Sequence, residues 1–475
     1  MKKSPVCTAM SAINRAASSR ECRSAQPKID DVKALRSHRF ECGYASARVV
    51  PYSPKIKKHL MAGFACGLRA EGVHDAMTVN ALWLGCGGGG MLWLTVDCIG
   101  LCRPEIEIIR ESLRDFTKNK GCIAINVSCS HTHAGLDTCG YWGNLPRTGK
   151  NKLFLNRLFE TAQAVAEAAY KNKKTGKLYA ANVKAPDAFH RGREPRFVDD
   201  KITRIRFVPD DKSKELWFVN ISAHPNILGK ENRQVSADYV HYMREAVKRD
   251  AKANVMFTAG AIGSVDGGFE ELKKGECRAL AVGEKFASYL CALEDEELEC
   301  SLKVAHREII FPDDNDVLTF LNLIGVMNTF KCRDESSLTG FGLVSEMTYI
   351  QIGKLKLLCL PGELFPELAY GGYLTAENSA TGRGEEFNPT PLAEIAQDRN
   401  LVICGVTNDF TGYAVPPNDF ILNEKYPCLN SAEDRFGKGH YHETNSLGIN
   451  TAHVIAENFA QMHKSVQNYG IKPKK

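Results

Sequence analysis

Short apolar runs alternate with longer amphipathic segments over most of the chain. The short runs are bounded by glycine, proline or polar residues and are too short for helices, which is typical of β-strands in a buried sheet. On this pattern we predict strands at 81–84, 91–96, 123–129, 217–221, 255–258, 355–360 and 401–404.

The longer segments repeat their apolar residues at helical spacing. In 153–170 the residues Phe154, Leu158, Ala162, Val165 and Ala169 lie three or four positions apart, so they share one helical face. Similar periodicity predicts further helices at 105–116, 237–248, 278–293 and 451–466. Strands interleaved with helices predict an α/β fold in which central mixed β-sheets are flanked by helices.

The domain organisation expected from this pattern is simple. Residues 1–36 are rich in serine, alanine and basic residues and show little apolar periodicity, so we expect a poorly ordered N-terminal extension. No linker-like segment interrupts 37–475, which we interpret as a single domain. We make no prediction of where the segment 312–345 lies within this domain.

Composition excludes some functions. The net charge is only +5 over 475 residues, and the basic residues are dispersed, so we do not expect nucleic-acid binding. The 17 cysteines are scattered and form no CxxC pair, which fits thiols in a reducing compartment. We expect no transmembrane segment and no signal peptide, hence a cytoplasmic protein of unknown oligomeric state.

Two histidines follow one predicted strand directly. If the side chains of 123–129 alternate between the sheet faces and the alternation continues, His131 and His133 lie on the same side. Imidazole is a metal ligand or a general base, although both residues are also compatible with an ordinary surface loop. His224 follows the strand at 217–221 in the same way.

The later strands also end at polar residues. Glu363 follows 355–360, Tyr413 follows 401–404, and a glycine-rich turn with Ser264 and Asp266 follows 255–258. Singly, each has a structural alternative: a charge at a helix N-terminus, a packed aromatic ring, a turn residue. Together they predict one site, because the carboxyl ends of strands in α/β sheets meet at one edge.

Two further pairs are candidates for binding. Arg191 and Arg193 have the chemistry to bind an anionic group, although a solvated loop is the simpler interpretation. His440 and His442 form a second HxH in a polar loop, where they could line the pocket or hold a second metal ion.

The order of these motifs resembles the catalytic domain of the neutral/alkaline non-lysosomal ceramidases, from about residue 40 to about residue 465. The landmarks are Ala62-Gly63-Phe64, Gly72-Val73-His74-Asp75, Val96-Asp97, Ser130-His131-Thr132-His133-Ala134-Gly135, Ala223-His224-Pro225, Ser236-Ala237-Asp238, the turn near Gly263, Pro361-Gly362-Glu363 and the run from Asn408 to Tyr413.

The resemblance implies a zinc-dependent hydrolase with one Zn²⁺ per chain that cleaves the amide bond of an N-acyl sphingoid base with metal-activated water. It implies a role in sphingolipid metabolism. Matched motif by motif, the metal ligands are His131, His224, Glu363 and Tyr413, and His133 is catalytic. Tyr413 is equally suited to hydrogen-bond the tetrahedral intermediate.

One departure from the family concerns the glycine turn. The family's GDVSPN is here Gly263-Ser264-Val265-Asp266-Gly267-Gly268, so serine and aspartate have exchanged places. We therefore expect Asp266 to act as a carboxylate base, and Ser264, Arg191 and His442 to contact substrate. The expected substrate is ceramide or a smaller, more soluble amide or ester.

Two alternatives remain at this stage. The first is a catalytically inactive relative, stabilised by metal, that binds a lipid or an amide. The second is a TIM-barrel amidohydrolase, which also carries HxH at the end of a strand but needs eight βα units.

Overall fold

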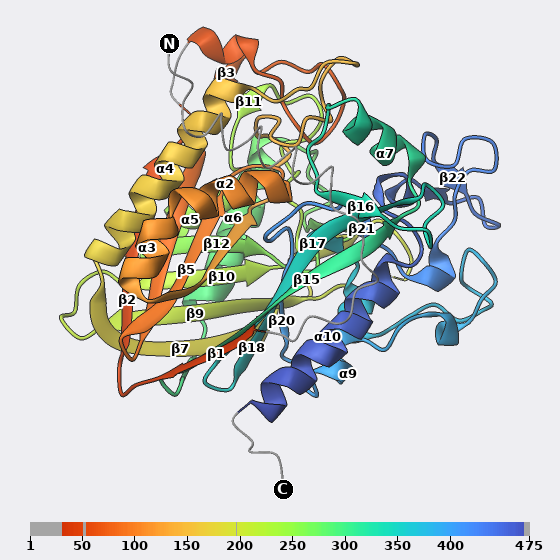
Figure 1. Ribbon diagram of the computed structural model, residues 1–475. Helices are drawn as coiled ribbons and strands as arrows, with labels where there is room; N and C mark the ends of the chain where they lie inside the picture. The colour runs from red at the N-terminus through yellow and green to blue at the C-terminus, as the bar shows by residue number, and fades with distance from the viewer. Residues whose placement is uncertain (1–30, 51–53, 196, 470–475) are drawn as a thin grey trace, which may run out of the picture.

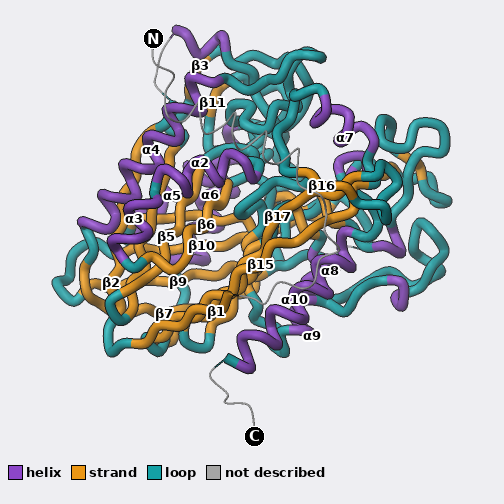
Figure 2. The backbone as a smooth tube through the Cα atoms, in the orientation of Figure 1, coloured by secondary structure: helices purple, strands orange, loops and turns teal. Residues whose placement is uncertain are grey.

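The computed structural model describes residues 31–50, 54–195 and 197–469 as two β-sheets packed face to face, with helices on their outer faces (Figure 1). In Figure 2 the strands of both sheets run between the helices α2–α6 on one side and α8–α10 on the other. The result is a four-layer α/β/β/α arrangement, so the predicted fold class is confirmed.

The first sheet has nine strands. In spatial order they are β12 (Asn254–Ala259), β10 (Leu216–Ile221), β9 (Lys201–Pro209), β7 (Lys174–Lys184), β2 (Phe40–Arg48), β4 (Thr78–Cys86), β5 (Gly89–Val96) and β6 (Cys122–Cys129), with β14 (Glu296–Glu297) beside β7. The β10–β12 and β5–β6 pairs are parallel, whereas the others are antiparallel, so the sheet is mixed.

The second sheet has six strands. They are β1 (Asp31–Arg36), β15 (Ser301–Asp313), β17 (Phe341–Ile352), β18 (Leu355–Cys359) and β20 (Val402–Cys404), with β16 (Lys331–Arg333) beside β17. Only β18 and β20 pair in parallel. The described residues thus contain two large sheets with free edges, four two-stranded ones and no closed barrel, which excludes the TIM-barrel amidohydrolase alternative.

The helices cover both outer faces. The longer ones are α2 (Arg103–Ser112), α3 (Arg114–Lys120), α4 (Lys152–Lys171), α5 (Tyr239–Asp250), α6 (Glu276–Cys291), α7 (Asp316–Leu323) and α10 (Thr451–Asn468). Helices α4, α5 and α6 contact the first sheet, and α10 contacts β15 and β17 of the second. Among the described residues, none of the helices combines the length and the hydrophobicity needed to cross a bilayer.

Short elements complete the described chain. They are β3 (Gly72–Val73), β8 (Phe189–Arg191), β11 (Gln234–Val235), β13 (Val265–Gly267), β19 (Glu363–Leu364), α8 (Pro366–Tyr370), α9 (Leu392–Ile395), β21 (Tyr413–Ala414), β22 (Ala432–Glu433) and β23 (Gly439–His440).

The strands predicted from apolar runs are buried on both faces. In β4, Ala81 and Trp83 belong to the core under the helices, whereas Leu82 and Leu84 belong to the core between the two sheets. Because both faces need apolar side chains, the sequence is nearly continuous in hydrophobic residues. Each predicted strand and helix is present, and the helix expected at 105–116 is divided into α2 and α3 at Leu113.

The N-terminal boundary differs from the expectation. The last residues of the expected extension form β1, which pairs with β15, while residues 1–30 lie outside the described part. The unplaced segment 312–345 contains the end of β15, helix α7, strand β16 and the start of β17, so it belongs to the second sheet and its connections.

The two sheets are joined by backbone hydrogen bonds where the strands end. After β20, Gly405 donates to the carbonyl of Ala259 at the end of β12 (2.9 Å), and the carbonyl of Val406 accepts from Cys129 at the end of β6 (3.0 Å). Val406 also donates to Gly362, beyond β18, at 3.0 Å. Strand ends from both sheets therefore meet in one place.

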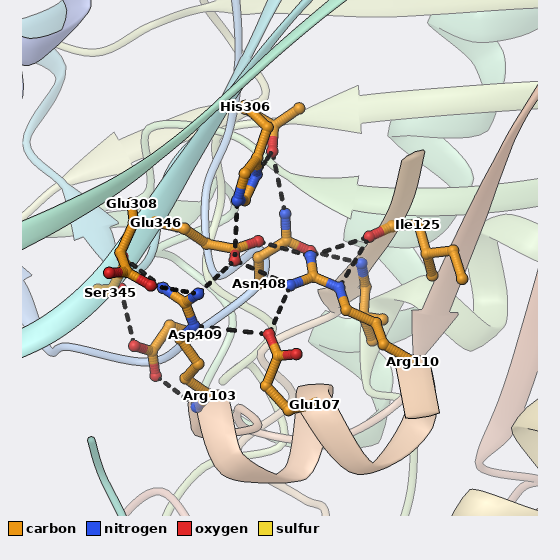
Figure 3. Close-up of polar contacts among 12 residues, drawn as sticks. Arg103, Glu107, Arg110, Ile125, His306, Glu308, Ser345, Glu346, Asn408 and Asp409 are labelled. Carbon is orange, nitrogen blue, oxygen red and sulfur yellow. Dashed lines mark hydrogen bonds and ion pairs between the residues drawn. The ribbon is translucent and has the colours of Figure 1, made fainter. Parts of the chain in front are cut away.

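A cluster of charged residues ties α2 to the second sheet (Figure 3). Arg110 binds both carboxylate oxygens of Glu346 on β17, at 2.8 and 2.5 Å, and Arg103 contacts the same carboxylate at 3.2 Å. Burial alone would raise the pKa of Glu346, but Arg110 and then His306 and Arg103 outweigh it and lower that pKa to about 2. The carboxylate is fully buried and ionised at neutral pH.

We call the backbone hydrogen bonds of Gly405 and Val406 that connect the two sheets the joint. We predict that Gly405→Ala, in this joint, destabilises the protein. A Cβ at Gly405 would lie 2.6 Å from the carbonyl oxygen of Gly260 and 3.1 Å from that of Gly362, so backbone must move. We expect a loss of about 1–3 kcal/mol in the free energy of unfolding, measured by urea titration. Gly439→Ala, where a Cβ meets nothing within 4 Å, is the matched control. Equal stabilities of the two variants would contradict this account of the joint.

The ion-pair cluster yields a pH prediction. Because the pKa of Glu346 falls from 4.5 to about 2 on folding, its stabilisation is present above pH 4.5 and is lost as the pH drops toward 2. Glu346→Gln should therefore cost roughly 3–5 kcal/mol at pH 7, and the gap to wild type should narrow below pH 4.5. Urea midpoints measured from pH 7 to pH 2 check this. A gap that stays constant would refute it, and Glu308→Gln, at a partly exposed partner of Arg103, should cost less.

Candidate metal centre

His131 and His133 lie in a turn that follows β6. The strand ends at Cys129, His131 has a positive φ of 64°, and its N–H donates to the carbonyl of Cys98 at 2.9 Å. The strand alternation used to place the two histidines therefore does not continue to them, and that reasoning was wrong. Their rings nevertheless lie together, with centroids 5.0 Å apart, because the turn brings both to the same cavity.

His224 and Glu363 reach the same point from other strands. His224 follows β10, and Glu363 begins β19. Oxygen Oε2 of Glu363 lies 2.7 Å from Nε2 of His224 and 3.2 Å from Nε2 of His131. Nε2 of His133 is 3.2 Å from Nε2 of His131. Four ligand-type side chains thus converge, and His131, His224 and Glu363 among them are buried.

The rings of His131 and His224 are oriented by backbone carbonyls. Nδ1 of His131 faces the carbonyl oxygen of Ile99 at 2.7 Å, and Nδ1 of His224 faces that of Val265 at 3.1 Å. A carbonyl only accepts, so each Nδ1 carries a proton, and the Nε2 of each ring is the atom that faces Glu363. Two imidazole Nε2 atoms and a carboxylate oxygen directed at one point are a donor set that a divalent metal ion such as zinc accepts, and a carbonyl bound at each Nδ1 is typical outer-shell support for such a site.

The same contacts shift the pKa values of these side chains. Burial alone would raise the pKa of Glu363, but His131 and His224 outweigh it and hold that pKa well below its usual range. Burial would lower the pKa of His224, but the hydrogen bond to Glu363 raises it. Burial, followed by the neighbouring His131 and His224, lowers the pKa of His133 far enough to keep its imidazole neutral.

Tyr413 and His442 lie beside this group. Tyr413 pairs with Glu363 in the short β19–β21 ladder, and burial and the Glu363 carboxylate raise the pKa of its phenol well above 10. His442 packs edge-on against Tyr413 with ring centroids 4.8 Å apart. Both line the cavity, as expected from the sequence. The protonated phenol is a hydrogen-bond donor, the second of the two roles considered for Tyr413.

Ser264 lies in the turn after β12, Asp266 lies in β13, and both line the same cavity. Ser264 has a positive φ of 62°. The carboxylate of Asp266 contacts Asn226 and Lys274, at 2.9 and 3.3 Å. The structure thus brings both residues to the cavity, and the contacts of Asp266 are with polar side chains of the wall.

The two arginines are not in a solvated loop. Arg191 is buried against Glu367 at 2.6 Å and does not line the cavity, because Glu367 and the carbonyl of Phe197 hold its guanidinium. The expectation that Arg191 contacts substrate is therefore not supported. Arg193 does line the cavity, with its guanidinium bound to Asp419 and Glu443 at 2.8 Å each.

Several residues that complete the cavity were not predicted. They are Phe64, Tyr141, Trp142, Asn226, Lys274, Phe410 and Tyr441. Phe64 stood in a recognised landmark, and its ring lies 5.3 Å from that of His133. Lys274 lies in an exposed loop, and no motif or periodicity in the sequence marked it as a cavity residue. The whole cavity has a volume of about 550 Å³, within the range of small-molecule sites.

The fold is that of neutral ceramidases. The crystal structure of neutral ceramidase from Pseudomonas aeruginosa matches with a TM-score of 0.68 at 14% sequence identity, over 91% of this chain and 75% of that chain. The structure of a ceramidase complexed with C2 gives 0.69 at 13% identity, over 91% and 76%. No protein-family profile and no curated protein sequence matches the chain. At such low identity the likeness establishes the fold, and it confirms the resemblance at that level.

The convergence of ligand atoms from His131, His224 and Glu363 predicts a metal ion. We expect purified protein to hold close to one zinc ion per chain by elemental analysis. Loss of an outer-shell partner alone costs 10–100-fold in metal affinity, so His131→Ala or His224→Ala should cost at least roughly 100-fold. His453→Ala, on α10 and outside the cavity, is the control. Unchanged zinc content in both site variants would refute the ligand assignment.

Proposed function

We propose that the protein is a zinc-dependent hydrolase of the amide bond in an N-acyl amine. The observation that carries the proposal is the convergence of Nε2 of His131, Nε2 of His224 and Oε2 of Glu363 at one wall of a cavity, with each Nδ1 bound to a carbonyl. The ceramidase activity named for the two structural neighbours supports the choice of an amide.

The residues that would hold the ion are His131, His224 and Glu363, with His133 or Tyr413 completing the set. When bound, zinc supplies a Lewis acid that lowers the pKa of water from about 15.7 toward 7 and polarises the acyl carbonyl. Two neutral imidazoles and one carboxylate leave the net charge of the site positive with the ion present, which favours an oxyanion in the transition state.

His133 is suited to move the proton. Burial and the neighbouring histidines hold its pKa well below the usual range, its side chain is only partly buried, and it lines the cavity. In the proposed reaction, water forms a bond to the acyl carbon and His133 takes the proton that water loses. The C–N bond then breaks, and His133 gives that proton to the leaving amine. The protonated phenol of Tyr413 donates to the acyl oxygen as negative charge develops there.

This assignment predicts a difference between neighbouring histidines. His133→Ala should retain zinc but lower kcat on an N-acyl amide by about 10²–10⁴, because the proton transfer loses its carrier. His131→Ala should lose both zinc and activity. Zinc analysis together with amine release from an amide substrate measures both properties.

The outcomes separate the alternatives. Loss of zinc in His133→Ala would make His133 a third imidazole ligand, since the ligand atoms of the three histidines lie within 4.8 Å of one another. Zinc-loaded wild type that hydrolyses no N-acyl amide would overturn the proposed function in favour of a metal-stabilised binding protein.

A further inference from the structure

A second group of polar side chains lines the cavity next to the histidines. We call Asn226, Asp266 and Lys274 the polar triad, because each contacts the other two. Nδ2 of Asn226 donates to Oδ1 of Asp266 at 2.9 Å, and Nζ of Lys274 lies 3.1 Å from Oδ1 of Asn226 and 3.3 Å from Oδ2 of Asp266. All three residues line the cavity.

The polar triad is fixed relative to the candidate zinc ligands by backbone. Asn226 is two residues after His224, and His224 and Asp266 are bridged as neighbouring parallel strands. The N–H of His224 also donates to the carbonyl of Val265 at 2.8 Å. A group next to an amide bound at His131 and His224 can therefore reach the polar triad within the same cavity.

The polar triad keeps free capacity for hydrogen bonds. An ammonium has three N–H donors and Lys274 directs two of them within the triad, while the amide of Asn226 uses one donor of two. The carboxylate oxygens of Asp266 each accept more than one bond. The side chains of Asp266 and Lys274 are 27% and 37% exposed, so a ligand can reach them.

The charges of the polar triad select the kind of group. Asp266 and Lys274 form an ion pair, so the triad has no net charge and favours neither a cation nor an anion. It offers both donors and acceptors within a few ångströms. Hydroxyl groups, which both donate and accept, match such a set, whereas an alkyl chain would leave it desolvated and unpaired.

Aromatic side chains supply the apolar part of the cavity. Phe64 and Phe410 lie beside His133 and His131, with ring centroids 5.3 and 5.6 Å apart, and Tyr141 and Trp142 line the cavity nearby. Flat C–H faces of a ring bury apolar area against such side chains, while the edges of the same ring carry hydroxyl groups. A saturated ring with several hydroxyls therefore fits both kinds of wall.

We propose that the substrate is an N-acyl amino sugar, whose hydroxyl groups bind Asn226, Asp266 and Lys274. This inference rests on the proposed function and names its substrate class. Water adds to the acyl carbon, the C–N bond breaks, and the amine leaves with a proton, so the products are a carboxylic acid and a free amino sugar. The inference gives Asp266 a binding role in place of the role of base.

The test compares two amides with the same acyl group. N-acetylglucosamine and N-cyclohexylacetamide both carry an acetamide on a six-membered ring, but only the first has hydroxyls. We expect zinc-loaded wild type to prefer N-acetylglucosamine by at least roughly 100-fold in kcat/KM, because the polar triad is left unpaired by the other. Lys274→Met should lower kcat/KM for N-acetylglucosamine roughly 10–100-fold. Lys273→Met, one residue away and outside the cavity, is the matched control and should leave it unchanged.

Binding provides a readout that does not depend on turnover. Zinc-loaded His133→Ala should bind N-acetylglucosamine more tightly than N-cyclohexylacetamide in saturation-transfer NMR, and the added change Lys274→Met should abolish the difference. Equal binding of the two compounds, or faster hydrolysis of N-cyclohexylacetamide or of a short-chain ceramide, would overturn the sugar inference and leave the amide hydrolase standing. Hydrolysis of none of the three would overturn the proposed function, while the binding comparison would still decide the substrate class.

Discussion

The centre of the structure depends on backbone hydrogen bonds that join strand ends from two different sheets. The segment after β20 bonds to the ends of β12 and β6 and to the turn after β18, within four consecutive residues 405–408. Val406 and Asn408 take positive φ angles of 46° and 67° there. Such a conformation costs about 1–3 kcal/mol for a residue other than glycine, and it persists where several bonds hold it. His131 and His224, which follow strands of the first sheet, can therefore meet Glu363, which follows a strand of the second, in one cavity.

Much of the first sheet could be predicted because its strands are buried on both faces. Their apolar runs are nearly continuous. The motifs that resemble those of ceramidases lie just after the ends of these runs. The long strands β7 and β17 gave weaker signals for different reasons. In β7 only Gly176 and Leu178 are fully buried and the other residues are partly or fully exposed, whereas β17 is interrupted by the buried Ser345 and Glu346. Those two polar residues fit a strand only because Asp409 and Arg110 bind them from other elements.

The candidate ligands were predictable, but the reason for their proximity was not. His131, His224 and Glu363 each follow an apolar strand, which the sequence shows directly. The positive φ of His131 and the carbonyls that orient the two rings depend on tertiary contacts. Arg191 illustrates the opposite error, since an arginine in a polar segment suggested a solvated loop, whereas Glu367, distant in sequence, buries it in an ion pair.

The cavity has a buried part, formed by the candidate metal ligands, and a more exposed part, formed by loop residues. This difference explains why a resemblance in motifs does not identify the substrate. The candidate zinc ligands are buried and follow strand ends, so a substitution among the residues around them disturbs the backbone contacts between the sheets. Other residues that line the cavity include Phe64 and Lys274, which are more than a third exposed and lie in loops. Substitution in a surface loop costs little stability. The same fold can thus keep its buried candidate metal ligands while the side chains that loops contribute to the cavity differ, and Ser264 and Asp266, whose order is exchanged relative to the ceramidase motif, line that same cavity.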